Sequence, residues 1–372
     1  MEYEFENGFS EGSGRKSNQR MKAFLVLQFL LRNSDEAHPV KIDEITAYLQ
    51  EDCGIAAERR SIYRDIKEIN IAHVMLRSEC SFEEAEEMLF DDDDLALIQS
   101  KHLKGFYICD QNRSIVPDDI RLLAECVYSA KFIPDSFKNN YVDQICQSLS
   151  KFQEKQIKHD VFSLGSISTL NRETINNIDT IKDALPPHEP KKLRFIYLKY
   201  TLQNAAPRLT DRRHGREYIV SPYAMLIDNG YYYLLAIDDK VKTKRLTTYR
   251  IDRMRLIEIL PEPRTVTAEA EALDLQDYTR RVFSMIGGNR QRVTIRFVNS
   301  LLDAMVDRFG TQDVIYSQLD ETHITITATV EISDQFYGWL CGFRHMVKIT
   351  SPQSVVDDFA EYVKSISDWY HS

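Results

Sequence analysis

An α+β protein of several domains is the fold that this sequence predicts, and three observations support it. Apolar residues with helical spacing dominate residues 20–69, strand-like patterns begin at Lys191, and β and α patterns alternate after residue 290. A chain of 372 residues exceeds the usual size of a single hydrophobic core. We therefore expect two or three domains, with helices concentrated in the first half.

The composition is that of an ordinary globular protein, with 43% hydrophobic and 28% charged residues. No apolar run reaches the roughly 18 residues that a membrane span needs, and the polar start lacks the apolar core of a signal peptide. The six cysteines include no C-x-x-C pair, which argues against a disulfide framework or a zinc site. We expect a cytoplasmic protein without metal or cofactor, and a disordered tail over residues 1–18.

Charge is distributed unevenly along the chain. The net charge is -10, yet residues 191–255 contain fifteen basic and six acidic residues and so carry +9. Within them, residues 242–254 (KTKRLTTYRIDRM) place five basic side chains in a strand-like pattern. The overall acidity therefore says nothing against an anionic partner, and this segment predicts a surface that binds one.

Three helical patterns near the N-terminus predict a helix-turn-helix. They are RMKAFLVLQFLLR from Arg20, KIDEITAYLQE, and AAERRSIYRDIKEIN after the short turn DCGI. At about 100° per residue, Ile62, Ile66 and Ile69 gather on one side of the third helix, opposite a basic arc. We expect helix 57–69 to enter the major groove of duplex DNA, the alternative being a solvated basic face on a structural helix. The side chains expected to contact DNA are Arg59, Arg60, Ser61, Tyr63, Arg64 and Lys67.

A hairpin and an acidic insertion belong to the same region. Residues 95–110 (LALIQSKHLKGFYICD) can form a β-hairpin with Lys101, Lys104 and Gly105 at its turn. Residues 79–94 (ECSFEEAEEMLFDDDD) contain nine carboxylates and no basic residue. This insertion is either a solvated amphipathic helix that ends in an exposed loop, or a segment that folds over the basic helix and competes with DNA until a ligand moves it.

The remainder of the chain changes pattern twice. Residues 115–190 are typical of a helical linker, which ends at the prolines of LPPHEP. Five short strand patterns with tight turns then predict a small barrel or a strongly bent sheet. From residue 290 the patterns follow the order β, α, β, β, α, β, α, which is ferredoxin-like.

Three motifs in this order resemble WYL-domain transcriptional regulators. RRSIYRDIKEIN (59–70) is similar to the recognition helix of their N-terminal winged helix-turn-helix, with Ser61 in place of the usual Thr. YYL (232–234) lies where the eponymous Trp-Tyr-Leu occurs, and YRIDRM (249–254) matches the signature that ends this Sm-like domain. The segment after residue 290 resembles their C-terminal extension, the WCX domain, with Phe343-Arg344 where Phe-Gly is usual.

The resemblance implies a domain order. It places a winged helix-turn-helix over 19–114 with the acidic insertion inside it, a helical linker over 115–190, a WYL ligand-sensing domain over 191–262, a linker over 263–289 and a WCX-like domain over 290–372. It also implies that the basic surface of the WYL domain is a ligand-sensing groove, and in related regulators such grooves accept nucleotides or single-stranded DNA.

The chemistry of the YRIDRM segment fits such a groove. An arginine fork matches phosphate geometry, and tyrosine rings offer surfaces on which bases stack. Asp252 can pair with Arg250 or Arg253 and hold it rigid, although Tyr249 can equally pack in a core and Arg253 can simply pair with Asp252. The residues expected to bind ligand are Arg216, Ser221, Tyr232, Arg245, Tyr249, Arg250 and Arg253.

The sequence therefore predicts a ligand-responsive, DNA-binding transcriptional regulator that acts as a homodimer on double-stranded DNA. Its ligand is expected to be anionic, a nucleotide or single-stranded nucleic acid. No enzyme is expected, because the chain lacks G-x-S-x-G, P-loop, H-E-x-x-H and Rossmann motifs. The alternative is an accessory protein that binds single-stranded nucleic acid without regulating a promoter.

Overall fold

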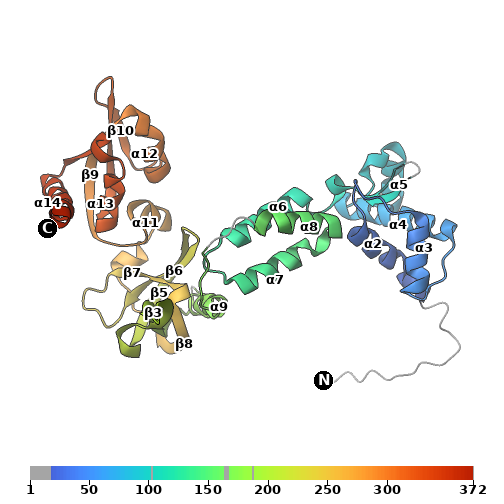
Figure 1. The fold of residues 1–372 in the computed structure, drawn as a ribbon, viewed down its shortest axis with the longest axis horizontal. Helices are drawn as coiled ribbons and strands as arrows, with labels where there is room; N and C mark the ends of the chain where they lie inside the picture. Colours follow the sequence, from blue (N-terminus) through green and yellow to red (C-terminus); the bar gives the residue numbers. More distant parts are fainter. Residues whose placement is uncertain (1–17, 102–103, 163–166, 187, 372) are drawn as a thin grey trace. The chain divides into compact units, whose positions relative to one another are not determined.

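The computed structural model describes residues 18–101, 104–162, 167–186 and 188–371, which divide into two compact units (Figure 1). The first unit contains the residues up to Ala130 together with Asp135–Ile167, and the second contains Lys131–Pro134 and Ser168–Ser372. The predicted tail falls almost entirely outside the described residues. No helix in the described ranges is both long and apolar enough to cross a membrane.

The first unit opens with the three predicted helices, each with one buried apolar face. They are α2 (Lys22–Asn33), α3 (Ile42–Glu51) and α4 (Arg59–Ser78), preceded by a short 3-10 helix η1 (Asn18–Met21). Because apolar residues recur every three or four positions, each helix buries one stripe. The shared core includes Val26, Leu30, Ile45, Leu49, Ile62 and Ile66.

The expected hairpin is present as β1 (Ile98–Lys101) and β2 (Gly105–Ile108), an antiparallel pair. Val40 extends this pairing, since its backbone exchanges hydrogen bonds with Phe106 at 2.7 and 2.8 Å. Gly105 has φ +121°, and a Cβ there would lie 2.1 Å from the Val40 carbonyl oxygen. The buried Asn70 side chain holds the hairpin on α4 by bonding both the N–H and the C=O of Ile98.

Helix α4 is longer than predicted, since it begins at Arg59 rather than residue 57 and runs past residue 69 to Ser78. The added turns form because Ile71 and Val74 are buried against a helix of the acidic insertion, α5 (Phe82–Asp91). Ser81 and Glu84 cap α5 reciprocally, each side chain accepting from the other's backbone N–H. A 3-10 turn, η2 (Asp93–Leu95), leads from α5 into the hairpin.

Three further helices complete the first unit: α6 (Pro117–Ser129), α7 (Asp135–Ile145) and α8 (Lys151–Phe162). They pack around Ile120, Ala124, Val142 and Leu149. An ion pair between Arg32 and Glu154 joins them to α2, and a 2.6 Å hydrogen bond from the Ser150 hydroxyl to Asp35 joins them to the segment that follows α2. These polar contacts make the helices and the N-terminal core one unit.

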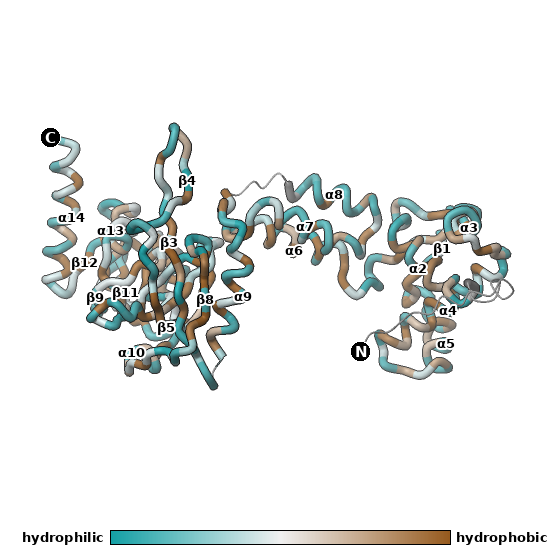
Figure 2. The backbone as a smooth tube through the Cα atoms, turned by 90° about the horizontal axis from the view of Figure 1, so that it is seen from below, coloured by the Kyte–Doolittle hydropathy of each residue, from teal (hydrophilic) through white to brown (hydrophobic). Residues whose placement is uncertain are grey.

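The second unit contains a curled antiparallel sheet in the order β8-β3-β5-β6-β7, with β4 paired to the outer half of β3. Helix α9 (Thr174–Ala184) packs against β8 and β3. The sequence did not predict β4, which forms with the end of β3 a hairpin that projects from the sheet (Figure 2). The strands are β3 (Lys191–Gln203), β4 (Ala206–Asp211), β5 (Glu217–Asp228), β6 (Tyr231–Asp238), β7 (Leu246–Arg250) and β8 (Met254–Pro263).

A second sheet follows two short helices, α10 (Ala268–Glu271) and α11 (Leu275–Arg281). Its strand order is β10-β11-β9-β12, all antiparallel, and its element order along the chain is the β, α, β, β, α, β, α predicted. Its core includes Phe297, Phe309 and Phe336. The elements are β9 (Asn289–Val298), α12 (Leu302–Phe309), β10 (Ile315–Gln318), β11 (His323–Ile332), α13 (Asp334–Cys341), β12 (Val347–Ser351) and α14 (Gln353–His371).

Replacing Gly105 with alanine should destabilise the first unit, because the new Cβ would collide with the Val40 carbonyl and force the hairpin off its partner. We expect a loss of about 1–3 kcal/mol in the free energy of unfolding. The measurement is urea unfolding followed by far-UV circular dichroism. Both tryptophans, Trp339 and Trp369, lie in the second unit, so their fluorescence should not change.

Gly54→Ala is the matched control, because Gly54 also has a positive φ but a Cβ added there would meet nothing within 4 Å. It should cost only the backbone strain of about 1 kcal/mol. Equal losses in the two variants would show that the contact with Val40 contributes nothing.

Candidate functional site

Helix α4 presents the basic face that the sequence predicted. The side chains of Arg59, Arg60, Arg64 and Lys67 are exposed, and the Tyr63 ring is 53% exposed. Within the described parts of the chain, Arg60 and Arg64 form no ion pair. Two guanidinium groups are therefore available for an anion outside the protein.

A buried polar cluster sets the rotation of α4. The Lys22 ammonium lies 3.1 Å from the Asp65 carboxylate, with the two side chains only 7% and 11% exposed, and it also donates to the Ser61 hydroxyl. Burial raises the pKa of Asp65, and the hydrogen bond and charge of Lys22 oppose that rise. Ser61 is thus half-buried beside Lys22, and the structure separates it from the exposed basic residues.

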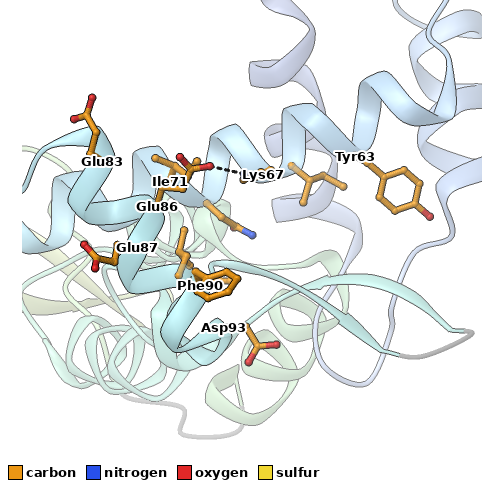
Figure 3. A pocket seen from close by; sticks show the side chains of 12 residues that line it. Tyr63, Lys67, Ile71, Glu83, Glu86, Glu87, Phe90 and Asp93 are labelled. Atoms are coloured by element: carbon orange, nitrogen blue, oxygen red, sulfur yellow. Dashed lines mark hydrogen bonds and ion pairs between the residues drawn. The ribbon is translucent and has the colours of Figure 1, made fainter.

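The other two basic side chains of this face have partners. Arg59 lies 2.5 Å from Asp43 of α3, and Lys67 lies 2.5 Å from Glu86 of α5 (Figure 3). All four side chains are at least 45% exposed, so each pair contributes at most about 1 kcal/mol. An incoming phosphate can therefore compete with either carboxylate.

The hairpin lies beside this face. The Tyr63 ring meets the Phe106 ring edge-on, with 5.5 Å between the centroids. Lys101 and Lys104, at the two sides of the turn, are exposed. The hairpin therefore supports Tyr63 and adds positive charge next to α4.

In the curled sheet, the Arg250 side chain is paired within the protein. Its guanidinium donates to both carboxylate oxygens of Asp252, at 3.0 and 2.8 Å, and stacks 3.4 Å from the centroid of the Tyr231 ring. Burial alone would lower the pKa of Arg250, but the hydrogen bonds and charge of Asp252 outweigh it and raise the pKa. Of the two arginines that Asp252 could hold, it holds Arg250.

The Arg253 side chain does not share the Asp252 carboxylate, because strand β7 ends before this residue. β7 ends at Arg250, and Ile251–Arg253 form a 3-10 turn, so the strand-like pattern predicted for residues 242–254 does not extend past Arg250. The Arg253 guanidinium lies 5.9 Å from the centroid of the Tyr200 ring. Its Nε is buried and has no hydrogen-bond partner among the described residues.

Arg216 lies near Arg253 across β3. Arg216 directly precedes Glu217, which pairs with Ile196, while Arg253 directly precedes Met254, which pairs with Tyr197. The two arginines therefore approach the same part of β3 from its two sides. Arg216 is exposed and forms no ion pair with a described residue.

Arg245 lies at the opposite end of β7. At roughly 3.3 Å per residue, the strand separates it from the turn that carries Arg253 by about 17 Å. There it lines a cavity of about 720 Å³ together with Arg281 and Arg290. The structure thus divides the predicted ligand residues between two places.

The remaining three predicted ligand residues are packed inside the second unit. Ser221 is fully buried, where its hydroxyl contacts Asp239 and accepts from the Thr265 N–H at 2.8 Å. Tyr249 is 6% exposed, and its burial among aromatic rings raises its pKa. Tyr232 is half-buried and meets Phe132 edge-on at 4.7 Å.

Two arginines outside the predicted set join the Arg216 surface. Arg212 and Arg213 are exposed and lie 6.0 and 5.8 Å from the ring centroids of Tyr197 and Tyr218. They occupy a turn in which Arg213, His214 and Gly215 all have positive φ. The run of basic residues around Gly215 in DRRHGR was the available signal in the sequence.

Among the described residues, no cluster of His, Cys, Asp and Glu could hold a metal ion.

Replacing Asp252 with alanine should destabilise the second unit by about 3–5 kcal/mol, because it leaves the Arg250 charge without its buried partner. The control is Glu258→Ala, which removes the exposed partner of Arg194 and should cost less than about 1 kcal/mol. Urea unfolding followed by the near-UV signal of the tyrosines measures both. Similar losses would show that the Asp252 pair is no more than a surface ion pair.

Comparison with known proteins identifies the domains of the second unit. Two solved structures are similar at low identity: proteasome accessory factor B/C (PafBC) of Arthrobacter aurescens, and a CRISPR Cas-related protein. PafBC has 14% identity to this chain and a TM-score of 0.28, and the match covers 100% of this chain and 52% of the PafBC chain. This chain therefore spans about half the length of PafBC. The second has 13% identity and a TM-score of 0.33, covering 94% and 92%. No curated protein matches.

Residues 176–259 match the WYL domain and residues 289–367 match the WCX domain, so the chain carries these two domains in the expected order.

Proposed function

We propose that this protein is a DNA-binding transcriptional regulator that responds to an anionic ligand. In this proposal the first unit is a winged helix-turn-helix that binds duplex DNA. The WYL domain is an Sm-like barrel that senses the ligand, and the ferredoxin-like WCX domain follows it. The observation that carries the proposal is the pair of exposed guanidiniums of Arg60 and Arg64 on α4, which form no ion pair with a residue that the structure describes.

The geometry of α4 supports duplex DNA as the partner. Its N-terminal half has an exposed basic side, while the opposite side is fixed on α2 and α3, as a helix that enters a major groove requires. The hairpin places Lys101 and Lys104 where they can reach the phosphate backbone beside that groove. As a homodimer, the protein would bring two such helices to half-sites spaced by whole turns of DNA.

The surface around Arg253 supports an anionic ligand. The buried Nε of Arg253 has no acceptor among the described residues, and a buried donor without a partner carries a desolvation cost that a ligand oxygen would remove. Arg212, Arg213 and Arg216 add positive charge around the same part of β3. A phosphate of a nucleotide or of single-stranded nucleic acid offers the oxygens that such guanidiniums bind. The cavity beside Arg245 is a second place in this unit where an anion would meet several arginines.

Replacing Arg64 with alanine should weaken binding of the full chain to random duplex DNA and flatten its dependence on salt. Each lost phosphate contact reduces the slope of log affinity against log salt concentration by about 0.9. Fluorescence anisotropy over a series of salt concentrations measures both quantities.

The matched control is Arg121→Ala, which removes an exposed arginine of α6 in the same unit and the same amount of net charge. The proposal fails if the two variants lose affinity equally, because the effect would then be one of overall charge. Binding to single strands but not to duplex would favour an accessory protein for single-stranded nucleic acid.

Replacing Arg253 with alanine should weaken binding of a short labelled single-stranded DNA, or of the nucleotides that compete with it, roughly ten- to a hundredfold, because one charge-assisted contact of about 1.5–3 kcal/mol is lost. Duplex binding should be retained. Arg194→Ala is the control, since Arg194 already pairs with Glu258 on the same sheet. An unchanged affinity in Arg253→Ala would move the ligand site away from this turn.

A further inference from the structure

The acidic insertion forms one wall of a groove whose other wall shares Tyr63 and Lys67 with the proposed DNA-binding face. The groove has a volume of about 690 Å³ and lies between α4, α5 and the segment before the hairpin (Figure 3). Volumes of about 300–1,000 Å³ are typical of small-molecule sites. Its lining has an apolar floor and a charged rim. The floor contains Ile66, Ile71, Leu89, Phe90 and Ala96. The rim contains Glu83, Glu86, Glu87 and Asp93.

The floor is fixed by the core of the first unit. Ile66, Ile71 and Ala96 are each at most 7% exposed, and Ile66 and Ile71 are held by the packing of α4 on its neighbours. Phe90 is different, because its side chain lines the groove yet is 90% exposed. A ligand that covers both this exposed ring and the apolar floor would remove apolar surface from water, and the free energy of that burial would favour binding.

The rim has a strong excess of negative charge. Four carboxylates line the groove, against one basic side chain, Lys67. Lys67 pairs with Glu86 at 2.5 Å, which leaves Glu83, Glu87 and Asp93 without an ion-pair partner among the described residues. Carboxylates around an aromatic ring favour a cation, since the face of the ring also attracts positive charge.

We propose that this groove binds an amphipathic organic cation: an apolar body that fills the space over Ile66 and Ile71, with a positive centre that faces Phe90 and the free carboxylates. The charge of the rim excludes the anions proposed for the WYL domain, so the two sites would take ligands of opposite sign. Binding here does not depend on the proposed DNA-binding function.

The test is isothermal titration of the full chain with tetraphenylphosphonium, a compact apolar cation. We expect saturable binding at one site per chain. Tetraphenylborate, which has nearly the same size and shape but a negative charge, is the matched ligand control and should not bind there. Equal binding of the two ions would overturn the proposal, because it would show that charge plays no part.

Matched variants then locate the binding. Phe90→Ala should weaken binding of tetraphenylphosphonium roughly fivefold, whereas Phe82→Ala, which removes an exposed aromatic ring of the same helix outside the groove, should not. Likewise the double variant Glu83→Gln/Glu87→Gln should weaken binding roughly tenfold. Its control, Glu79→Gln/Asp91→Asn, makes the same change in charge outside the groove and should leave the affinity unchanged.

All of the replaced side chains are exposed, so the variants are expected to fold, which circular dichroism checks. Absence of binding by the unmodified chain, or equal losses in lining and control variants, would overturn the proposal. A further outcome would also overturn it: binding of a helical Lys/Leu peptide without binding of tetraphenylphosphonium would assign the groove to a basic segment of another protein.

Discussion

The buried ion pair between Lys22 and Asp65 determines which side of α4 faces the solvent, and the surfaces of the first unit follow from it. Because Asp65 is directed at α2, Arg64 and Lys67 are carried to the outer side of the helix. A buried pair is costly to break once formed, about 3–5 kcal/mol when one partner is removed. The pair therefore fixes the rotation of α4 more firmly than the apolar contacts alone, which tolerate small shifts of a helix about its axis.

The WYL domain also contains a buried ion pair, and there the pair fixes one side chain rather than the rotation of a helix. Asp252 is 2% exposed and binds Arg250 through two hydrogen bonds, so one of two neighbouring arginines becomes part of the framework. The 3-10 turn after β7 then directs Arg253 away from that pair. The buried carboxylate thus satisfies Arg250 and not Arg253, and the spacing Arg-Ile-Asp-Arg is what separates the positions of the two guanidiniums.

The sequence predicted those features that depend on local periodicity. The apolar stripes of α2, α3 and α4, the hairpin around Gly105 and the element order after residue 290 all follow from spacing and turn residues. Features set by distant partners were missed. The extra length of α4 depends on α5, the half-buried position of Ser61 depends on Lys22, and the division of Arg245 from Arg253 depends on where β7 ends. The strand β4 was missed because half of its residues are polar and none of them is buried.

The position of α5 limits what the acidic insertion can do to DNA binding. Its contact with the basic face is through Lys67, whereas Arg60 lies seven residues earlier, about 10 Å along the helix axis. At physiological salt the screening length is about 8 Å, so the carboxylates of α5 act strongly on Lys67 and weakly on Arg60. A helix placed there would alter the affinity proposed for phosphate at Lys67, and its ion pair with that face does not involve Arg60. Tyr63 and Lys67 belong both to that face and to the groove. If the groove binds its proposed ligand and the face binds DNA as proposed, any effect of one on the affinity of the other would be reciprocal.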